Sequence, residues 1–128
     1  MIVGVVTDDR QAVIHLTVHG PAGQEQEIEA IIDTGFDGWL SLPSSLIARL
    51  GLVWRRRGRA LLADGSESVF DIYEATVGWD GEARRIPVDE AETVPLVGMS
   101  LIEGYELTVQ VQPGGSVTVR ALSEARGG

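Results

Sequence analysis

The chain has 128 residues, 44% of them apolar, and a formal net charge of −9 at pH 7. This length is typical of one domain with a modest core of its own, and it excludes a two-lobed enzyme. The negative charge excludes bulk attraction to nucleic acid or to anionic membranes, and no segment approaches membrane-spanning length. We therefore expect neither nucleic acid nor a membrane as a partner.

Cysteine is absent from the sequence, which excludes a disulfide framework, a thiol nucleophile and a cysteine-ligated metal site. The first six residues are apolar, but the segment is short and no basic region precedes it, so it predicts a strand and not a secretory signal. We expect a cytoplasmic protein that uses no cofactor and no metal.

The first paired strands lie on either side of a turn at 20–23. Apolar residues alternate with polar ones over 12–19 and again over 25–32, where the polar positions are occupied by glutamate. This period of two predicts a half-buried antiparallel hairpin with an acidic outer face. His15 and His19 lie on the polar side without a matching acidic cluster, so we expect them to be solvated or hydrogen-bonded and not to bind a metal.

The most informative stretch follows directly, where Ile31-Ile32 runs into Asp33-Thr34-Gly35. A carboxylate at the mouth of a buried strand is costly to desolvate, and the glycine indicates a tight backbone turn. The tripeptide alone is equally compatible with an aspartate that merely caps a turn. The apolar pair before it and the strand expected at 39–43 favour a functional carboxylate.

A single helix is expected in the first half, over 44–51, capped by Ser44 and ended by Gly51. The basic run at 55–59 follows it and could in principle bind phosphate. Because the run is short and the chain is acidic, we expect its arginines to face solvent or to pair with carboxylates.

Two turn sequences predict further hairpins. Asp64-Gly65 is a strong hairpin signal at the centre of 60–70, and Asp80-Gly81 is expected to join strands over 69–79 and 83–88. Both hairpins would belong to one antiparallel system, and the first would stand out beyond the sheet.

The last part of the chain has an apolar run that ends at Gly98, where a glycine would let two backbones approach closely. A short helical pattern follows. Strands at 106–111 and 116–122 predict a closing hairpin. We expect one domain over 1–122 and a flexible tail over 123–128.

Three landmarks together resemble the signature of the retropepsin-like aspartic proteases: Asp33-Thr34-Gly35, a hairpin tip near Gly65, and Leu96-Val97-Gly98. They occur in the family's order and span most of the chain, and Phe36 after the glycine is most like the small prokaryotic members. The resemblance implies an all-β, single-lobe closed barrel with one or two short helices. It also implies a flap hairpin that closes over an extended peptide.

The resemblance assigns a role to each matching position. Asp33 would be the catalytic residue, Thr34 and Gly35 would support the catalytic loop, and Gly98 would be a structural glycine beneath that loop. The implied substrate-binding residues are Asp37, Leu40, Asp64, Gly65, Val94 and Leu96.

The sequence contains one Asp-Thr-Gly, whereas aspartic proteolysis uses two carboxylates that share one proton. One carboxylate activates water while the other donates a hydrogen bond to the scissile carbonyl. The family's mechanism therefore implies a homodimer in which Asp33 of each subunit meets its twin on the symmetry axis. Such an enzyme would cut extended peptides or proteins, with highest activity at acidic to near-neutral pH.

Departures from the family pattern leave a second interpretation open. Phe36 replaces a small residue, the flap has few glycines, and Met99 stands where retroviral relatives have arginine. The chain could instead be a catalytically weak or inactive peptide-binding or dimerisation module of the same fold. A third interpretation, Asp33 as a phosphoryl acceptor, is disfavoured because the chain contains no lysine.

Overall fold

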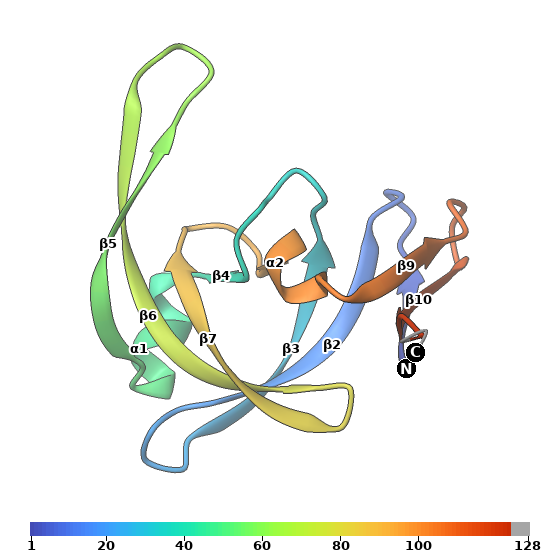
Figure 1. Cartoon of the computed structure of the whole chain (residues 1–128), viewed down its shortest axis with the longest axis horizontal. Coiled ribbons are helices and arrows are strands. Elements are labelled where there is room, and N and C mark those ends of the chain that lie inside the picture. Colours follow the sequence, from blue (N-terminus) through green and yellow to red (C-terminus); the bar gives the residue numbers. More distant parts are fainter. Residues whose placement is uncertain (124–128) are drawn as a thin grey trace.

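The computed structural model describes residues 1–123, which form ten strands and two short helices (Figure 1). Of the tail expected at 123–128, all but Ser123 lies outside the described residues. The elements in chain order are β1 (Ile2–Val6), β2 (Ala12–His19), β3 (Glu25–Ile32), β4 (Leu40–Leu42), α1 (Ser44–Leu50), β5 (Val53–Leu61), β6 (Glu67–Trp79), β7 (Glu82–Glu90), β8 (Leu96–Val97), α2 (Met99–Ile102), β9 (Tyr105–Val109) and β10 (Ser116–Ala121).

Six of the strands close into a barrel. Their hydrogen-bonded order is β6-β7-β4-β8-β3-β2, and β2 pairs back onto β6 through Val18 with Val77 and His19 with Thr76. Two neighbouring pairs, β3 with β8 and β4 with β7, run parallel, and the other pairs are antiparallel. The all-β, closed-barrel architecture with two short helices is therefore confirmed.

Alternating side chains of these strands fill the barrel. Val18 of β2, Leu40 of β4, Val77 of β6 and Val88 of β7 are all 0% exposed, which is the consequence of the period-two patterns in the sequence. Helix α1 adds Leu46, Ile47 and Leu50 to the same core. Such a core fixes the positions of the strand ends, and the candidate site lies at those ends.

Helix α1 begins at Ser44, the first residue of the expected range, but its N-cap is the residue before. Pro43 is the N-cap, and its carbonyl accepts from the N–H groups of Leu46 and Ile47, both at 3.1 Å. Ser44 is already helical and makes no capping hydrogen bond, so the prediction that Ser44 caps the helix was wrong. The predicted end at Gly51 is confirmed, because Gly51 adopts the left-handed conformation with φ of 63°.

Both predicted hairpins in the middle of the chain are present. Asp80 and Gly81 form a two-residue turn with φ of 53° and 84°, the geometry that matches the twist of the flanking strands β6 and β7. The β5–β6 turn is longer than a two-residue turn over Asp64-Gly65 would be. There the N–H of Gly65 donates to Leu62 at 2.9 Å, and Gly65 follows the turn with φ of 88°.

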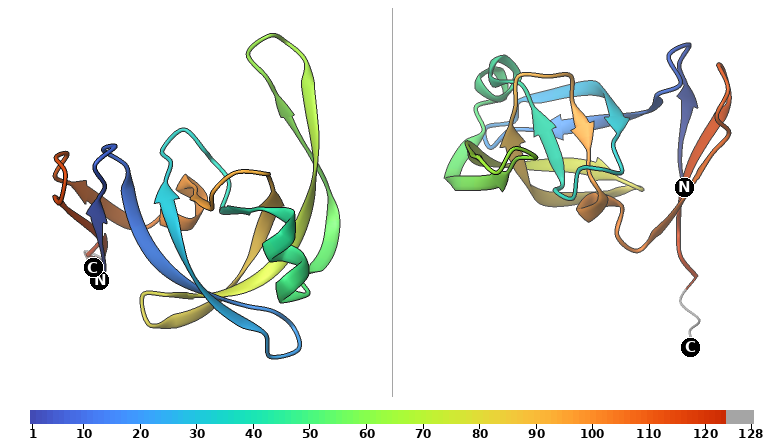
Figure 2. Two further views of the ribbon diagram at one scale, coloured as in Figure 1. Left: turned by 180° about the vertical axis from the view of Figure 1, so that it is seen from behind. Right: turned by 90° about the horizontal axis from the view of Figure 1, so that it is seen from above.

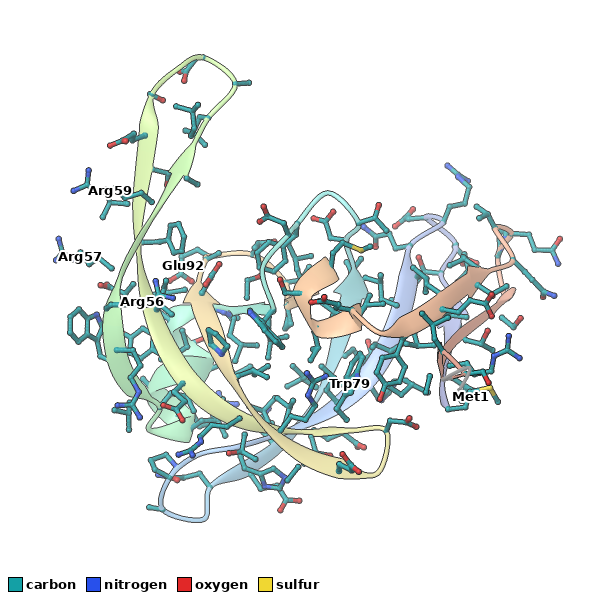
Figure 3. All side chains as sticks on the ribbon, viewed as in Figure 1. Met1, Arg56, Arg57, Arg59, Trp79 and Glu92 are labelled. Carbon is teal, nitrogen blue, oxygen red and sulfur yellow. The ribbon has the colours of Figure 1, made fainter. Side chains whose placement is uncertain are left out.

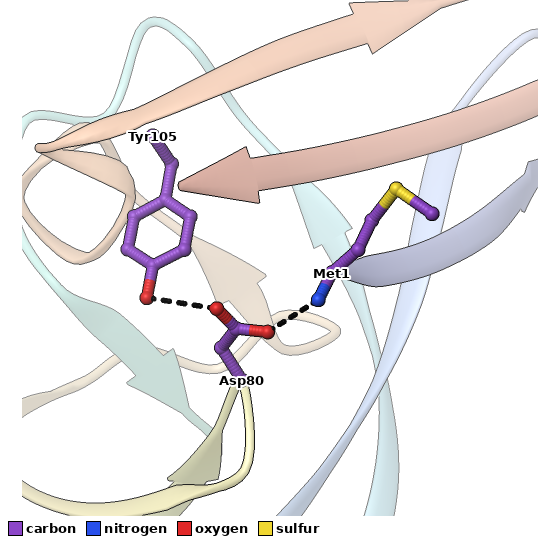
Figure 4. A network of polar contacts seen from close by, with 3 residues as sticks. All are labelled: Met1, Asp80 and Tyr105. Carbon is purple, nitrogen blue, oxygen red and sulfur yellow. Dashed lines mark hydrogen bonds and ion pairs between the residues drawn. The ribbon is translucent and has the colours of Figure 1, made fainter. Parts of the chain in front are cut away.

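The terminal strands lie beside the barrel as a separate extension, with β1 between β2 and β10, and β9 at the edge (Figure 2). Asp80 links this extension to the β6–β7 turn (Figure 4). The ammonium group of Met1 donates to Asp80 at 2.5 Å, and the hydroxyl of Tyr105 donates to its other oxygen at 3.3 Å. The hydrogen bond from the ammonium group lowers the pKa of Asp80.

The basic run on β5 pairs mainly with carboxylates of β6, as expected. Arg55 pairs with Glu74, Arg57 with Asp71 at 3.5 Å, and Arg59 with Glu67 at 3.3 Å. Figure 3 shows Arg57 and Arg59 pointing away from the barrel and Arg56 pointing toward it. These cross-strand pairs leave little of the run free for phosphate.

The two histidines also pair across strands, His15 with Glu29 at 3.5 Å and His19 with Glu25 at 3.7 Å. Within residues 1–123, no three side chains of the metal-binding types are grouped so that they could hold an ion. Neither of the helices described here has the length and apolar character that crossing a membrane requires.

Candidate active site

Asp33 lies at the mouth of the barrel, directly after β3. Its N–H donates to the carbonyl of Val97 at 2.9 Å and so extends the β3–β8 ladder by one residue. Its Oδ1 accepts from the N–H of Gly35 at 2.9 Å, which closes an Asx turn. The other carboxylate oxygen has no hydrogen-bond partner among the residues described. The half-buried side chain is thus oriented by its own loop with one oxygen free.

Strand β8 and helix α2 clamp this loop from below. The N–H groups of Met99 and Ser100 donate to the carbonyls of Phe36 and Gly38 at 2.8 Å and 3.0 Å. The hydroxyl of Ser100 donates to the carbonyl of Asp37 at 2.6 Å. The loop that follows Asp33 is therefore held by backbone contacts at several successive residues.

Gly98 is a point where the two backbone segments approach closely. A Cβ added to Gly98 would lie 2.2 Å from the carbonyl oxygen of Gly38, far inside van der Waals contact. The N–H of Gly98 also donates to the carbonyl of Trp39 at 3.0 Å. The geometry agrees with the structural role predicted for this glycine.

An open groove of about 830 Å³ runs over Asp33. One wall is the loop after Asp33, a second is the inner part of the β5–β6 hairpin, and a third is the end of β7 with the residues that follow it. Figure 1 shows the β5–β6 hairpin extending well beyond the barrel on the same side as the 33–38 loop. A hairpin so placed can cover whatever lies in the groove.

The structure brings part of the predicted site together. Asp33, Gly35, Asp37 and Leu96 all line the groove. Thr34 is exposed beside them, and the support that it is expected to give to the loop stays a prediction.

Leu40 does not belong to the groove. Its side chain is 0% exposed and packs in the barrel core, because β4 turns Leu40 and Leu42 inward and Ser41 outward. Val94 lies in the loop before β8, 56% exposed, and does not line the groove either. The sequence resemblance located the right segments but not the direction of these side chains.

Asp64 and Gly65 lie at the exposed tip of the hairpin, outside the groove lining. Oδ1 of Asp64 accepts from the hydroxyl and the N–H of Ser66 at 2.6 Å and 2.9 Å, and these hydrogen bonds lower the pKa of Asp64. In the described chain both residues shape the tip. Contact with a substrate would require the hairpin to move.

Sequence reasoning missed Ser41 and Asp89, which line the groove beside Asp37. The signal was available in the alternation of the strands. Ser41 is the polar residue between two core leucines, and Asp89 alternates with the buried residues Ile86 and Val88, so it faces away from the core. Burial raises the pKa of Asp89, the charge of Arg56 opposes this rise, and the charge of Asp37 adds to it.

The described residues have the fold of the retropepsin-like aspartic proteases. Its parts here are a six-stranded barrel, an Asp-Thr-Gly loop at the mouth of the barrel that packs on Gly98, and a long hairpin beside that loop. A retropepsin-like aspartic protease from Rickettsia conorii superposes with a TM-score of 0.58 at 18% identity, covering 94% of this chain and 90% of that one. EIAV protease, solved with an inhibitor, gives a TM-score of 0.53 at 15% identity, covering 74% of this chain and 88% of its own.

Neither the protein-family models nor the curated proteins give a match to this sequence. The similarity to solved structures therefore establishes the fold, and the activity has to be argued from the site.

Proposed function

We propose that the protein is a homodimeric aspartic endopeptidase that hydrolyses extended peptides with water activated by two Asp33 carboxylates. The observation that carries this proposal is the position of Asp33. Its carboxylate is oriented by the Asx turn, lines a groove beneath a hairpin, and keeps one oxygen free. A carboxylate held in this way is suited to activate a water molecule.

The second carboxylate must come from another copy of the chain. A catalytic dyad requires two carboxyl groups close enough to share a proton, and Asp33 is hydrogen-bonded to no other carboxyl group within residues 1–123. Twofold symmetry would supply an identical Asp33 on an identical loop. In the dimer, one carboxylate takes a proton from water while the protonated partner donates to the peptide carbonyl oxygen.

The terminal extension is the surface on which we place the partner. Val3 and Val5 of β1 are 62% and 47% exposed, although valine on a strand normally packs against another surface. Figure 1 shows the loop after Asp33 between the β5–β6 hairpin and this extension. A partner bound on that side would bring its own loop toward Asp33 and leave the hairpin free to move.

The β5–β6 hairpin would act as the flap. Val69 and Phe70 line the groove and would cover the bound peptide, whose extended backbone can hydrogen-bond to strand edges. Closure would exclude bulk water and strengthen the electrostatic interactions at the dyad.

The alternative, a peptide-binding or dimerisation module without useful turnover, is favoured by Phe36. Its ring lies 2.6 Å from the position of a Cβ on Gly38 and also lines the groove. Phe36 therefore occupies space in the groove that a small residue would leave to substrate.

The test combines cleavage and mass. Wild-type protein should cleave an unfolded protein substrate, and pepstatin should inhibit this cleavage. Its mass in solution should be about twice the chain mass of 13.7 kDa. Asp33→Asn should retain the fold and the dimer mass but lose cleavage. Glu103→Gln also removes one negative charge, from an exposed residue outside the groove, and should retain cleavage. Peptide binding by a wild type that never cleaves would support the module instead.

A further inference from the structure

A second group of polar side chains lines the same groove as Asp33. Ser41 is 3% exposed and lines the groove, yet its buried hydroxyl oxygen has no hydrogen-bond partner. A buried hydroxyl without a partner costs free energy, and such groups are rare in folded proteins. The unpartnered oxygen is therefore available for a hydrogen bond with a group outside this chain.

Two carboxylates accompany this hydroxyl. Asp89 is the register partner of Ser41 on the neighbouring parallel strand β7. Its Oδ2 lies 3.3 Å from the position that a Cβ on Gly38 would occupy, which places it next to Asp37 in the loop. Neither carboxylate has a side-chain hydrogen bond or ion pair with any residue between 1 and 123.

The surrounding charges leave this pocket negative. Arg56 lowers the pKa of Asp89 but forms no ion pair with it, and Arg59 is paired with Glu67. Glu90 adds another carboxylate to the groove lining. Burial disfavours the ionised form of Asp89, and a bound cation would reverse that preference.

We propose that Ser41, Asp37 and Asp89 form a specificity pocket for a basic side chain of the bound peptide, with arginine preferred. A guanidinium group carries five N–H donors in a planar fork and can serve two carboxylates and one hydroxyl at once. The inference rests on the proposed function in one respect, that the groove binds an extended peptide. It goes beyond that function by naming which peptides are selected.

The test measures binding and not turnover, so that its failure is distinct from failure of the protease proposal. The probe is a set of fluorescein-labelled ten-residue peptides, each with one arginine at a different position, and each matched by a twin with citrulline. Citrulline has nearly the shape of arginine without the charge. Affinities are measured by fluorescence anisotropy on Asp33→Asn protein, which removes cleavage while the pocket remains.

At one peptide position, arginine should bind about tenfold or more tightly than citrulline, as charge-assisted hydrogen bonds would give. Asp89→Asn in the same background should reduce this ratio to near one. Ser41→Ala should reduce it by a smaller factor. The control Glu103→Gln removes the same charge outside the groove and should leave the ratio unchanged, which separates the pocket from the general negative charge of the protein.

Equal affinities for the twins at every position would overturn the proposal, as would an arginine preference that survives Asp89→Asn or falls equally in Glu103→Gln. If wild-type protein cleaves no peptide but the Asp89-dependent preference is present, the pocket stands and the protease proposal fails. If wild-type protein cleaves peptides but shows no arginine preference, the protease proposal stands and the pocket proposal fails.

Discussion

The carbonyl oxygen of Gly38 lies 2.2 Å from the point where any larger residue at position 98 would place its Cβ. The loop after Asp33 therefore packs directly on the backbone of Gly98. Both segments meet through backbone atoms, which cannot move aside as a flexible side chain could. The position of the loop after Asp33 depends on the absence of one side chain.

We expect Gly98→Ala to destabilise the protein by roughly 3 kcal/mol, the upper range for overpacking, because the new methyl group meets backbone atoms. Cleavage should be lost even where the protein stays folded, since the loop must shift. Thermal unfolding and a cleavage assay measure the two effects. Gly78→Ala is the control, because a Cβ there meets nothing within 4 Å, and equal stability of the two variants would contradict the close packing.

The tip of the flap hairpin offers a second test. Gly65 has φ of 88° with open space around it, so Gly65→Ala should cost about 1–2 kcal/mol of local conformational strain. Gly23 has the same φ in the β2–β3 turn, also in open space, and Gly23→Ala should cost a similar amount. If the hairpin covers the substrate, kcat/KM falls several-fold in Gly65→Ala alone. An equal effect of both substitutions would mean that only general stability matters.

The raised pKa of Asp89 makes a prediction about stability against pH. Burial is the main cause, Arg56 opposes it and Asp37 adds to it. Since the folded state disfavours the ionised form, Asp89 costs stability as pH rises from the ordinary value of 3.8 through its folded pKa. Asp89→Asn should therefore be more stable than wild type at pH 7, with the difference shrinking in acid.

Urea unfolding at several pH values measures this difference. Asp8→Asn, in the exposed β1–β2 turn, is the control for the general effect of removing one negative charge. A variant Asp89→Asn that is less stable than wild type at pH 7 would mean that Asp89 has a stabilising partner in the folded protein.

The partner surface can be tested on β1. Val3→Glu and Val5→Glu together should weaken the dimer, because the partner would have to bury two new charges. Sedimentation should show monomer at micromolar concentration, and cleavage should recover as the protein concentration rises. Val53→Glu places a charge on another exposed valine, at the start of β5, and should leave the dimer intact. If the β1 variant stays dimeric, the dimer interface does not include the exposed valines of β1.

Much of this structure could be predicted from the sequence because the signals are local. The alternation in β2 and β3, the Asp80-Gly81 turn and the left-handed Gly51 each reflect backbone preferences of neighbouring residues. The resemblance then ordered these pieces into a barrel. Closure through Val18 and Val77 was not visible, because it joins strands far apart in the chain.

The site was predicted less completely than the fold. Asp33 and Gly98 follow from a motif, whereas Leu40 was placed on the wrong face because the motif does not state which way β4 presents its side chains. Alternation along β7 turns Asp89 away from the core, but the parallel pairing that places it beside Ser41 joins strands far apart in the chain. That pairing became apparent only from the three-dimensional structure.

The central claim is that two copies of Asp33 act together, and a subunit-mixing experiment tests it most directly. Wild-type chain at fixed concentration is refolded with increasing amounts of Asp33→Asn chain, and cleavage is measured. Random pairing predicts that activity falls to roughly half with an equal amount of variant and to roughly a tenth with a ninefold excess. Activity that stays constant at every ratio would mean that each Asp33 works without its twin, and the account would be contradicted.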